Sequence, residues 1–512
     1  MRAIATVGGL TMLSRVAGFL RDVLMARILG AGPAADAFFV AFRLPNLFRS
    51  LFAEGAFTAS FLPMFSGELK TQGHASAKRL AEEALAVMLG LLLPFTALMS
   101  IAMPAVVWLL ASGFADDPGQ FGLAVDLSRI TFPYLTLISL VALFGAVLNS
   151  LGRFGPFAAA PVLLNLVQIA GLLACGPLGI APELMLSWGA PVAGAAQLIW
   201  MAMACRRAGM SLRLRRPRLT PRVRRLFALL APGLVGAGVY QINLLIGTNL
   251  ASWLPAGAVS FLQYADRLNQ LPLGVVGVAI GTALLPILSA QVAAGDREKV
   301  RHYLSRALEF ALFLGLPAAV ALVAIPATLV RVLFEGGAFG PAETAATAAT
   351  LRAFAIGMPA LILAKVLSGA YFARQDTKGP VRIAVVVLVS NALLSLALMA
   401  PLAHVGLALA PGLTAWLNVG LLVAGLRRRG QLDLDARFKA RSWRIVLASL
   451  GMGAALAAAV AWGEPLLHGP TLQEFLALAV VVGGGMAVYF GLCFLLGAAR
   501  LSDLRDLRRR SS

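Results

Sequence analysis

Polar and charged side chains recur through an otherwise apolar stretch between Ser14 and Phe57, near the start of the chain. They are Arg15, Arg21, Asp22, Arg27, Asp36, Arg43, Asn46, Arg49 and Glu54. A charged group near the middle of a bilayer costs about 2.5–3.5 kcal/mol on insertion scales. If this stretch spans a membrane, these groups must therefore face protein or a water-filled space.

Several of these residues share one helix face. On an ideal helix, Arg43, Asn46 and Arg49 fall within an arc of about 120°, and Asp36 lies on the same face as Arg43. Such a basic face suits a multiply anionic ligand, because the planar guanidinium grips phosphate oxygens in pairs. Arginines near the ends of spans also extend to the lipid headgroups, and we favour that interpretation for Arg27 alone.

The composition indicates that membrane helices position these residues. The chain has 512 residues, of which 59% are hydrophobic and 13% charged, against about 25% charged in ordinary soluble domains. Long apolar runs recur from end to end, which is typical of a polytopic helical membrane protein. The period-two alternation of a membrane β-barrel does not occur. We read the start of the chain as the first span and not as a cleaved signal.

The apolar runs predict an all-α protein with about fourteen transmembrane helices. Their approximate limits are 4–30, 35–64, 81–111, 129–150, 157–176, 184–205, 223–251, 258–290, 305–333, 347–372, 380–400, 404–426, 443–463 and 474–498.

The distribution of charge predicts the orientation. The net charge is +20, and Lys and Arg concentrate in the connections after even-numbered spans, above all between Arg206 and Arg225. The odd-numbered connections are neutral or acidic. By the positive-inside rule, both termini lie in the cytoplasm, including the Arg500–Arg510 tail. This topology explains the basic residues without nucleic acid as a partner, although such loops also attract anionic lipids.

A faint internal repeat suggests two lobes. Arg43-Leu-Pro-Asn and Arg267-Leu-Asn-Gln lie about 220 residues apart, and each precedes an apolar segment with a proline. Copies with an even number of spans share one orientation across the membrane. We therefore predict an N-lobe over 1–220, a C-lobe over 221–430, and a further helix pair with a basic tail over 431–512. The two lobes are expected to enclose a central cavity.

The second half of the chain carries few charges within its apolar runs. Asp266 and Arg267 lie inside one span, and Lys365 is alone in another. If the lobes face one another, Arg267 converges with the arginines of the first half. Asp22, Asp36, Glu54 and Asp266 are then the counter-charges in the absence of a ligand. The alternatives are local pairing for Asp266 and Arg267, and extension to the headgroups for Lys365.

Enzymatic chemistry finds no support in the sequence. Walker A, Gly-x-Ser-x-Gly and zincin motifs do not occur. The three cysteines are far apart and have no metal-ligand spacing. We therefore expect a protein that binds and moves a ligand, with no cofactor and no metal.

Several motifs resemble the MurJ (MviN) family of bacterial lipid II flippases, within the multidrug/oligosaccharidyl-lipid/polysaccharide exporter superfamily. They are Ser14-Arg15-Val-Ala-Gly-Phe-Leu-Arg21-Asp22, Ala35-Asp36-Ala-Phe-Phe-Val-Ala-Phe-Arg43-Leu-Pro-Asn46, Phe52-Ala-Glu54-Gly-Ala-Phe, Tyr264-Ala-Asp266-Arg267-Leu and Tyr371-Phe-Ala-Arg374-Gln-Asp376-Thr-Lys-Gly-Pro. The resemblance runs through the first twelve predicted spans and is most specific in the first two.

This resemblance implies a MATE-like fold in the bacterial inner membrane. It implies transfer of undecaprenyl-pyrophosphate-linked disaccharide-pentapeptide from the cytoplasmic to the periplasmic leaflet by alternating access. Arg15, Arg21, Arg49 and Arg267 take the places of the family's pyrophosphate-binding arginines. The supporting positions are Ser14, Asp22, Asp36, Arg43, Asn46, Glu54, Asp266 and Lys365. The last two spans are similar to those that form a groove for the lipid tail.

Two positions depart from what relatives contain. Gln270 stands where some relatives have a glutamate. The spans that hold a sodium site in a relative offer Gln241, Asn243, Asn391 and Ser395 here, without an acid. The residues therefore do not favour sodium, and coupling to the membrane potential or to another ion stays open.

Three alternatives remain. A flippase for another prenyl-pyrophosphate glycan, such as an O-antigen unit, has the same charge requirements. A MATE-type exporter of cationic drugs fits poorly, because it needs acids and aromatic residues in its cavity. A membrane scaffold would bind cell-wall synthesis and division machinery through its basic loops.

Overall fold

The computed structural model describes residues 2–52, 56–463 and 471–499. Glu54 and the Arg500–Arg510 tail lie outside this range. The described residues form α-helices with one 3-10 helix, η1 (Ser112–Asp116), and no strand. Contacts divide the chain into two units, Met1–Ser260 with Gly336–Phe339, and Phe261–Glu335 with Gly340–Ser512.

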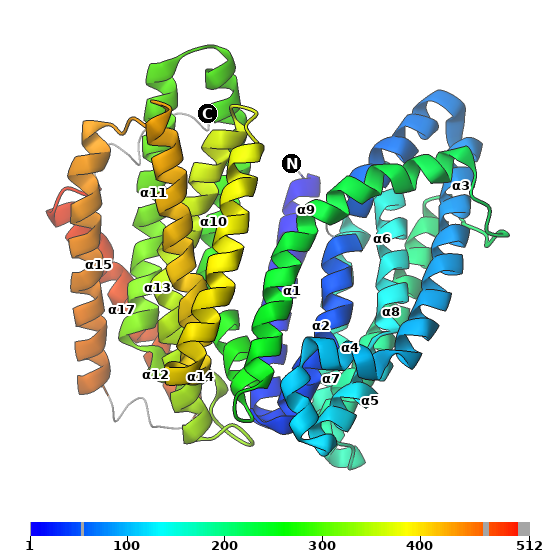
Figure 1. Cartoon of the computed structure of the whole chain (residues 1–512), viewed down its shortest axis with the longest axis horizontal. Helices are drawn as coiled ribbons and strands as arrows, with labels where there is room; N and C mark the ends of the chain where they lie inside the picture. The colour runs from blue at the N-terminus through cyan, green and yellow to red at the C-terminus, as the bar shows by residue number, and fades with distance from the viewer. Residues whose placement is uncertain (1, 53–55, 464–470, 500–512) are drawn as a thin grey trace. The chain divides into compact units, whose positions relative to one another are not determined.

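The first unit contains the helices from α1, in blue, to α9, in green, in Figure 1. They are α1 (Arg2–Leu29), α2 (Pro33–Phe52), α3 (Ala56–Ile101), α4 (Met103–Leu110), α5 (Pro118–Thr131), α6 (Tyr134–Ser150), α7 (Gly155–Leu178), α8 (Pro182–Arg207) and α9 (Pro221–Ser252). Its core is an apolar cluster that includes Phe61, Phe65, Leu80 and Tyr134.

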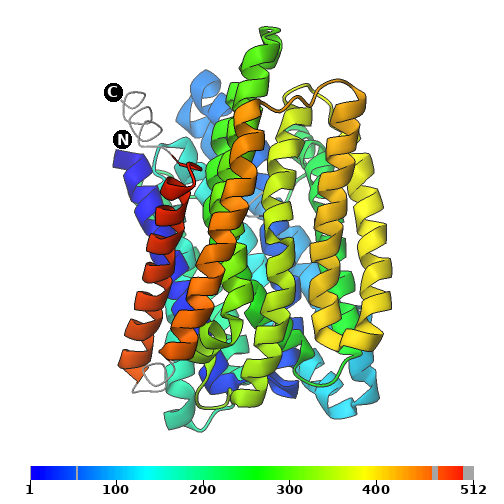
Figure 2. The ribbon, with the colours of Figure 1, turned by 90° about the vertical axis from the view of Figure 1, so that its left-hand side faces the viewer.

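The second unit contains the remaining helices. They are α10 (Ala258–Ala293), whose first residues belong to the first unit, α11 (Arg297–Ala324), α12 (Pro326–Phe334), α13 (Pro341–Phe372), α14 (Lys378–Arg428), α15 (Ala436–Trp462) and α17 (Thr471–Leu495). Figure 2 shows α15 and α17, in orange and red, side by side.

Local sequence signals explain where many helices begin and bend. Proline lies in the first turn of α5, α8, α9 and α13, where its missing N–H has no helical partner to lose. The long helices α3 and α14 contain non-helical residues at Gly73 (φ 79°) and Ala403 (φ 47°). Glycine adopts such a φ without steric cost. Both bends fall between predicted spans. The helix α14 therefore comprises two predicted spans, whereas α3 comprises the end of the second and most of the third.

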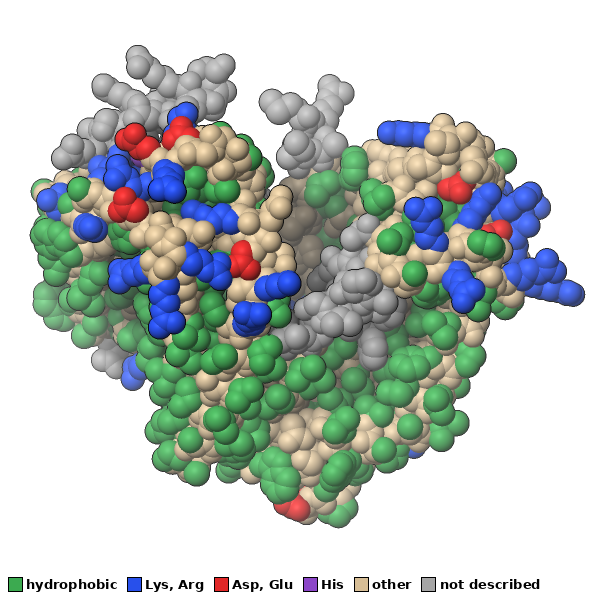
Figure 3. All heavy atoms as spheres, turned by 45° about the horizontal axis from the view of Figure 1, so that its top comes forward, with side chains coloured by type: hydrophobic (Ala, Val, Ile, Leu, Met, Phe, Trp, Pro, Cys, Tyr) green, Lys and Arg blue, Asp and Glu red, His purple; other side chains and the backbone are tan. Residues whose placement is uncertain are grey.

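Every predicted span has a helical counterpart. Nine helical segments of the described residues are long and apolar enough to cross a membrane, and the count of fourteen stays a prediction. In Figure 3, Lys and Arg side chains gather at one end of each unit, while hydrophobic side chains dominate its sides. Many large apolar residues are exposed, such as Ile101, Leu109 and Leu393. Exposed apolar faces with charged ends are typical of helices surrounded by lipid.

The units and the predicted lobes differ in extent. The first unit extends to Ser260 because α9 packs against α2, α3 and α4. The lobe boundaries at residues 220 and 430 come from the internal repeat in the sequence, and they stay a prediction.

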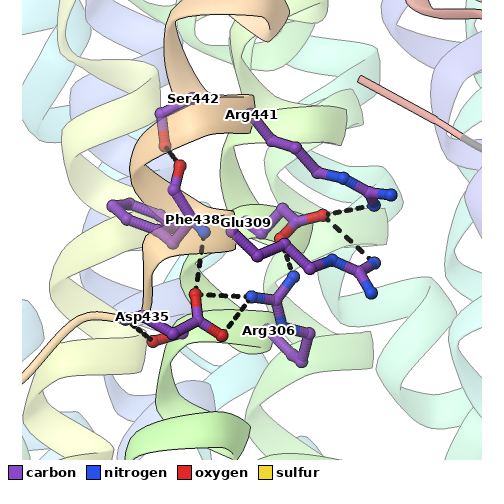
Figure 4. Close-up of polar contacts among 8 residues, drawn as sticks. Arg306, Glu309, Asp435, Phe438, Arg441 and Ser442 are labelled. Carbon is purple, nitrogen blue, oxygen red and sulfur yellow. Dashed lines mark hydrogen bonds and ion pairs between the residues drawn. The ribbon is translucent and has the colours of Figure 1, made fainter. Parts of the chain in front are cut away.

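A group of ionic residues, hereafter the Glu309 cluster, joins α11 to the start of α15 (Figure 4). Its members are Arg306, Glu309, Asp435, Arg437 and Arg441. Glu309 is 8% exposed and pairs with Arg306, with Arg441 at 3.0 Å and with Arg437 at 3.6 Å. Asp435 accepts hydrogen bonds from the Phe438 N–H at 2.7 Å and from Arg306 Nη2 at 2.6 Å. It thereby caps α15 and holds that helix against α11.

Candidate functional site

Arg21 is the centre of a buried polar group in the first unit, hereafter the Arg21 cluster (Arg21, Asp22, Asn165 and Gln168). Its guanidinium donates to Asp22 Oδ1 from Nε at 3.1 Å and from Nη2 at 2.7 Å. Its Nη1 donates to Asn165 Oδ1 and to Gln168 Oε1, both at 3.1 Å. These residues are 8%, 3%, 6% and 2% exposed, in the order named above. A buried cation is therefore balanced by one carboxylate and two neutral amides.

Close packing of α1 on α7 positions the cluster. Asn165 Nδ2 donates to the backbone carbonyl of Ser14 at 3.0 Å. A Cβ atom at Gly18 would lie 3.4 Å from the same Nδ2. Ser14, Gly18 and Arg21 follow the i, i+4, i+7 spacing of one helix face. Their face therefore meets the amides of α7 directly.

The cluster leaves part of its hydrogen-bonding capacity unused. Arg21 uses four of its five N–H donors in these bonds. Gln168 Nε2 is buried, and no hydrogen-bond partner for it exists among the described residues. A buried donor without a partner is costly. The cluster therefore has N–H donors available for one more acceptor group.

The other arginines of the first unit have different surroundings. Arg15 is exposed, and no side-chain hydrogen bond or ion pair joins it to any residue in the described ranges. Arg49 is half-buried and donates from Nε to Asn46 Oδ1 at 2.9 Å, within the same helix. Arg43 donates to the Thr248 hydroxyl of α9 at 2.8 and 3.0 Å. Arg43 therefore ties α2 to α9, a local structural role within the first unit.

Asp36 has partners other than the predicted ones. It is 2% exposed, and its carboxylate accepts from the Gly257 N–H at 2.7 Å, the Ser260 N–H at 2.8 Å and the Ser260 hydroxyl. These donors lie at the start of α10, where a helix has free N–H groups and a positive dipole end. The expected role of Asp36 as counter-charge to an arginine is therefore wrong for this structure. Asp22 does pair with an arginine, as predicted.

The predicted residues of the second unit lie on two helices. Asp266 and Arg267 are half-buried on α10, and Asp266 accepts a hydrogen bond from Gln270 one turn later. Lys365 is exposed on α13. Convergence of Arg267 with Arg15, Arg21 and Arg49 concerns both units and stays a prediction.

Sequence reasoning missed Asn165 and Gln168 as members of the site. They lie three residues apart in the apolar segment that became α7, and both are buried. Two amides at this spacing share a helix face. A pair of amides on one face of an apolar helix is the sequence signal that could have identified them as partners for the charged residues of α1.

The fold and its buried polar residues define a multi-pass membrane protein of all-helical, MATE-like architecture. A solved structure described as lipid II flippase MurJ in an inward closed conformation superimposes with a TM-score of 0.77 at 24% identity, covering 96% of this chain and 98% of that one. An inward-facing multidrug resistance transporter of the MATE family and MOP superfamily gives a TM-score of 0.68 at 15% identity, covering 83% of this chain and 98% of that one. These structures confirm the predicted fold class.

Sequence comparison then gives the family. The model of the family described as lipid II flippase MurJ matches residues 25–483. Probable lipid II flippases from Rhizobium tropici and Rhizobium meliloti are each 43% identical, and each alignment covers 100% of this chain and 97% of the relative. A lipid II flippase from Burkholderia cenocepacia is 36% identical and covers 97% of both chains. The chain belongs to the lipid II flippase MurJ family, which is a family of membrane transporters.

Proposed function

We propose that this chain moves lipid II, the undecaprenyl-pyrophosphate-linked peptidoglycan precursor, from the cytoplasmic to the periplasmic leaflet of the bacterial inner membrane. The observation that carries this proposal is the match over the whole chain to relatives named lipid II flippase. The motifs of α1, α2 and α10 support it, because the arginines of that family pattern are all present. We propose transport without a covalent step, and therefore no enzymatic role.

The chemistry of the Arg21 cluster suits an exchangeable anion site. Amide oxygens are weaker partners for a guanidinium than phosphate oxygens, since a phosphate oxygen adds the attraction of opposite charges to the hydrogen bond and is gripped in pairs. A diphosphate that reaches the cluster offers several charged oxygens to Arg21 and an acceptor to the Gln168 amide. In this proposal Arg15, Arg49 and Arg267 add positive charge around the same diphosphate.

Binding then favours transport through differential affinity. A ligand shifts a conformational equilibrium only as far as it binds one state better than the other. Diphosphate charge offsets repulsion among arginines that approach one another, so it stabilises the state in which they are closest. Alternating access by rocking of the two lobes is the movement we propose.

We further propose that both termini lie in the cytoplasm and that the partners are lipid II, membrane lipids and the cell-wall synthesis and division machinery. The clustering of Arg and Lys in alternate connections supports this orientation. Coupling to the membrane potential or to an ion other than sodium is our proposal for the energy source.

The test is complementation of a strain depleted of its lipid II flippase, combined with an assay that measures lipid II in each leaflet. We expect Arg21→Ala, Arg49→Ala and Arg267→Ala to abolish flipping while the protein still inserts. The matched control is Arg428→Ala, since Arg428 is exposed at the end of α14 and outside the proposed site. Normal flipping by all three site variants would refute the role of these arginines.

The same assay separates the rival substrates. An O-antigen flippase would leave lipid II on the cytoplasmic leaflet while restoring the transfer of O-antigen units in a strain that lacks that activity. A drug exporter would do neither and would lower the accumulation of cationic dyes.

A further inference from the structure

The connection between α8 and α9 combines arginines with exposed leucines. Residues 206–225, hereafter the arginine loop, have the sequence RRAGMSLRLRRPRLTPRVRR, and residues 211–220 within it have no regular secondary structure. No Asp or Glu occurs between Glu183 and Asp266. The loop must therefore obtain every counter-charge from elsewhere.

Two glutamates of α3 hold the inner side of the loop. Glu82, which is 1% exposed, accepts from the Arg213 backbone N–H at 3.1 Å and pairs with the Arg215 side chain. Glu83 accepts from the Thr220 hydroxyl at 2.8 Å. The path of the loop along α3 is thus fixed by ionic and polar contacts.

The first turns of α9 are anchored in the same way. Val223 and Leu226 are buried on one face. On another, Arg222 bonds to Ser76 at 3.0 Å and pairs with Glu68 at 3.5 Å. Figure 1 shows this part of α9 running at a steep angle to α3, α6 and α8. Its apolar stripe faces the first unit and its remaining arginines face outward.

The arginines on the outer side of the loop have no side-chain partner among the residues that the structure describes. Its exposed arginines are Arg206, Arg207, Arg213, Arg216, Arg218, Arg224 and Arg225. Across the described ranges, none of these seven guanidinium groups makes an ion pair or a hydrogen bond. Leu214 and Leu219 lie among them and are 68% and 73% exposed. The inner side of the loop is fixed against α3. The outer side is therefore an exposed surface that is both basic and apolar.

We propose that the outer side of the arginine loop is a docking surface for anionic phospholipid headgroups of the adjacent leaflet. Arginine forks fit phosphodiester oxygens, and exposed leucines enter the apolar region directly below the headgroups. A soluble acidic partner would match the arginines and leave both leucines in water. The loop directly follows α8, a helix long and apolar enough to span the membrane, so it begins at the membrane surface. This proposal concerns a separate surface and goes beyond the proposed transport activity.

The chain offers a selective probe of this surface. Its cysteines, Cys175, Cys205 and Cys493, are buried, so Leu219→Cys provides one accessible thiol for a polarity-sensitive fluorophore. The full-length protein is placed in nanodiscs of phosphatidylcholine alone or of phosphatidylcholine mixed with phosphatidylglycerol. We expect blue-shifted emission in the anionic nanodiscs, reversed by high salt because exposed charges are then screened.

Charge variants identify the responsible arginines. In the labelled protein, Arg216→Gln/Arg218→Gln is expected to lower the equilibrium constant for insertion roughly 25-fold, since each arginine near an anionic surface contributes about a factor of five. The matched control is Arg427→Gln/Arg428→Gln, which removes two exposed arginines at the end of α14. We expect this control to respond as the unsubstituted labelled protein does.

Three results would overturn the proposal. The first is identical emission in the two kinds of nanodisc. The second is an equal loss of response in the control variant. The third is a blue shift produced by soluble polyglutamate in phosphatidylcholine nanodiscs, which would identify the loop as a surface for acidic proteins. None of these three measurements depends on transport. Failure of the lipid-docking proposal is therefore distinguishable from failure of the proposed flippase activity.

Discussion

The Arg21 cluster and the Glu309 cluster place buried charge between helices in opposite ways. At Arg21, one guanidinium is balanced by one carboxylate and by two neutral amides of α7. At Glu309, three arginines surround one carboxylate, and Asp435 adds a second carboxylate that also caps α15. The first arrangement leaves an arginine that a stronger anion is able to recruit. The second holds two helices through ionised partners on both sides.

This contrast separates charges that act on a ligand from charges that hold the fold. Removing one partner of a buried ion pair leaves an uncompensated charge, which costs more than the pair itself contributed. Exchanging an amide for a phosphate oxygen leaves no such charge. We therefore expect substitutions in the Glu309 cluster to act on stability and those in the Arg21 cluster to act on transport.

The largest effect on stability is expected for Glu309→Ala. This variant leaves Arg306, Arg437 and Arg441 without their common partner, at a cost of about 3–5 kcal/mol. Thermal unfolding in detergent should occur at a clearly lower temperature. The control is Asp433→Ala. Asp433 pairs with Arg301, but its side chain is 71% exposed, and such exposed pairs contribute about 0–1 kcal/mol. Equal unfolding temperatures for the two variants would contradict a structural role of Glu309.

The next effect is on transport, and Gln168→Glu tests it. The variant gives Arg21 a second carboxylate and so makes the first cluster resemble the second. The added charge strengthens the bond to Arg21 by about 1.5–3 kcal/mol, so we expect flipping to fall roughly 10- to 100-fold. Little stability should be lost, because the Gln168 Nε2 group that the variant removes has no hydrogen-bond partner among the described residues. Leaflet-resolved lipid II measurements and thermal unfolding on the same preparations provide both values. Unchanged flipping would show that Arg21 need not exchange its partners during transport.

Asp435→Asn has a smaller expected effect. Asparagine still caps a helix, so the variant loses only the charge facing Arg306, about 1 kcal/mol. Burial alone would raise the pKa of Asp435, but the Phe438 N–H and Arg306 bond to the carboxylate and lower its pKa below 3.8.

The pH dependence of this variant follows from that direction. Because the folded-state pKa lies below the unfolded value, the stabilisation is present above the unfolded pKa and is lost as the pH falls through the folded pKa. The difference in unfolding temperature between the original protein and Asp435→Asn should therefore be constant from neutral pH down to about pH 5 and should shrink only in stronger acid. A difference that disappears near pH 6 would contradict this assignment.

Much of the fold was predictable because it depends on local pattern. Each predicted apolar span coincides with helix, and the breaks at Gly73 and Ala403 fall at predicted connections. The helix α5 was missed, because most of it lies between two predicted spans. The partners of charged residues were less predictable. Arg21 and Asn165 are 144 positions apart, and no periodicity connects residues over that distance. Charge predicts an arginine as the partner of Asp36, whereas its partners are two backbone N–H groups and the Ser260 hydroxyl. Every residue type except proline supplies a backbone N–H, so the sequence does not single out these donors.

The Glu309 cluster was missed for a related reason. The basic residues near α11 and α15 were explained by orientation in the membrane, an explanation that requires no partner. A single glutamate one turn after Arg306 gave no sign that three arginines from two helices would meet it. Composition therefore predicts which end of a helix is basic, and only packing determines which basic residues hold the structure.

The smallest effect on stability is expected at Arg15, which sharpens the comparison from the other side. Arg15 is exposed and unpaired among the residues in the described ranges, so Arg15→Gln should change the free energy of unfolding by no more than about 0.5 kcal/mol. Its proposed contact forms only with the diphosphate, so the same variant should lose flipping. Arg15→Lys keeps the charge without the planar fork and should retain part of the activity. If Arg15→Gln flips lipid II normally, the arginine acts on neither the fold nor the ligand, and the proposed site contracts to Arg21, Arg49 and Arg267.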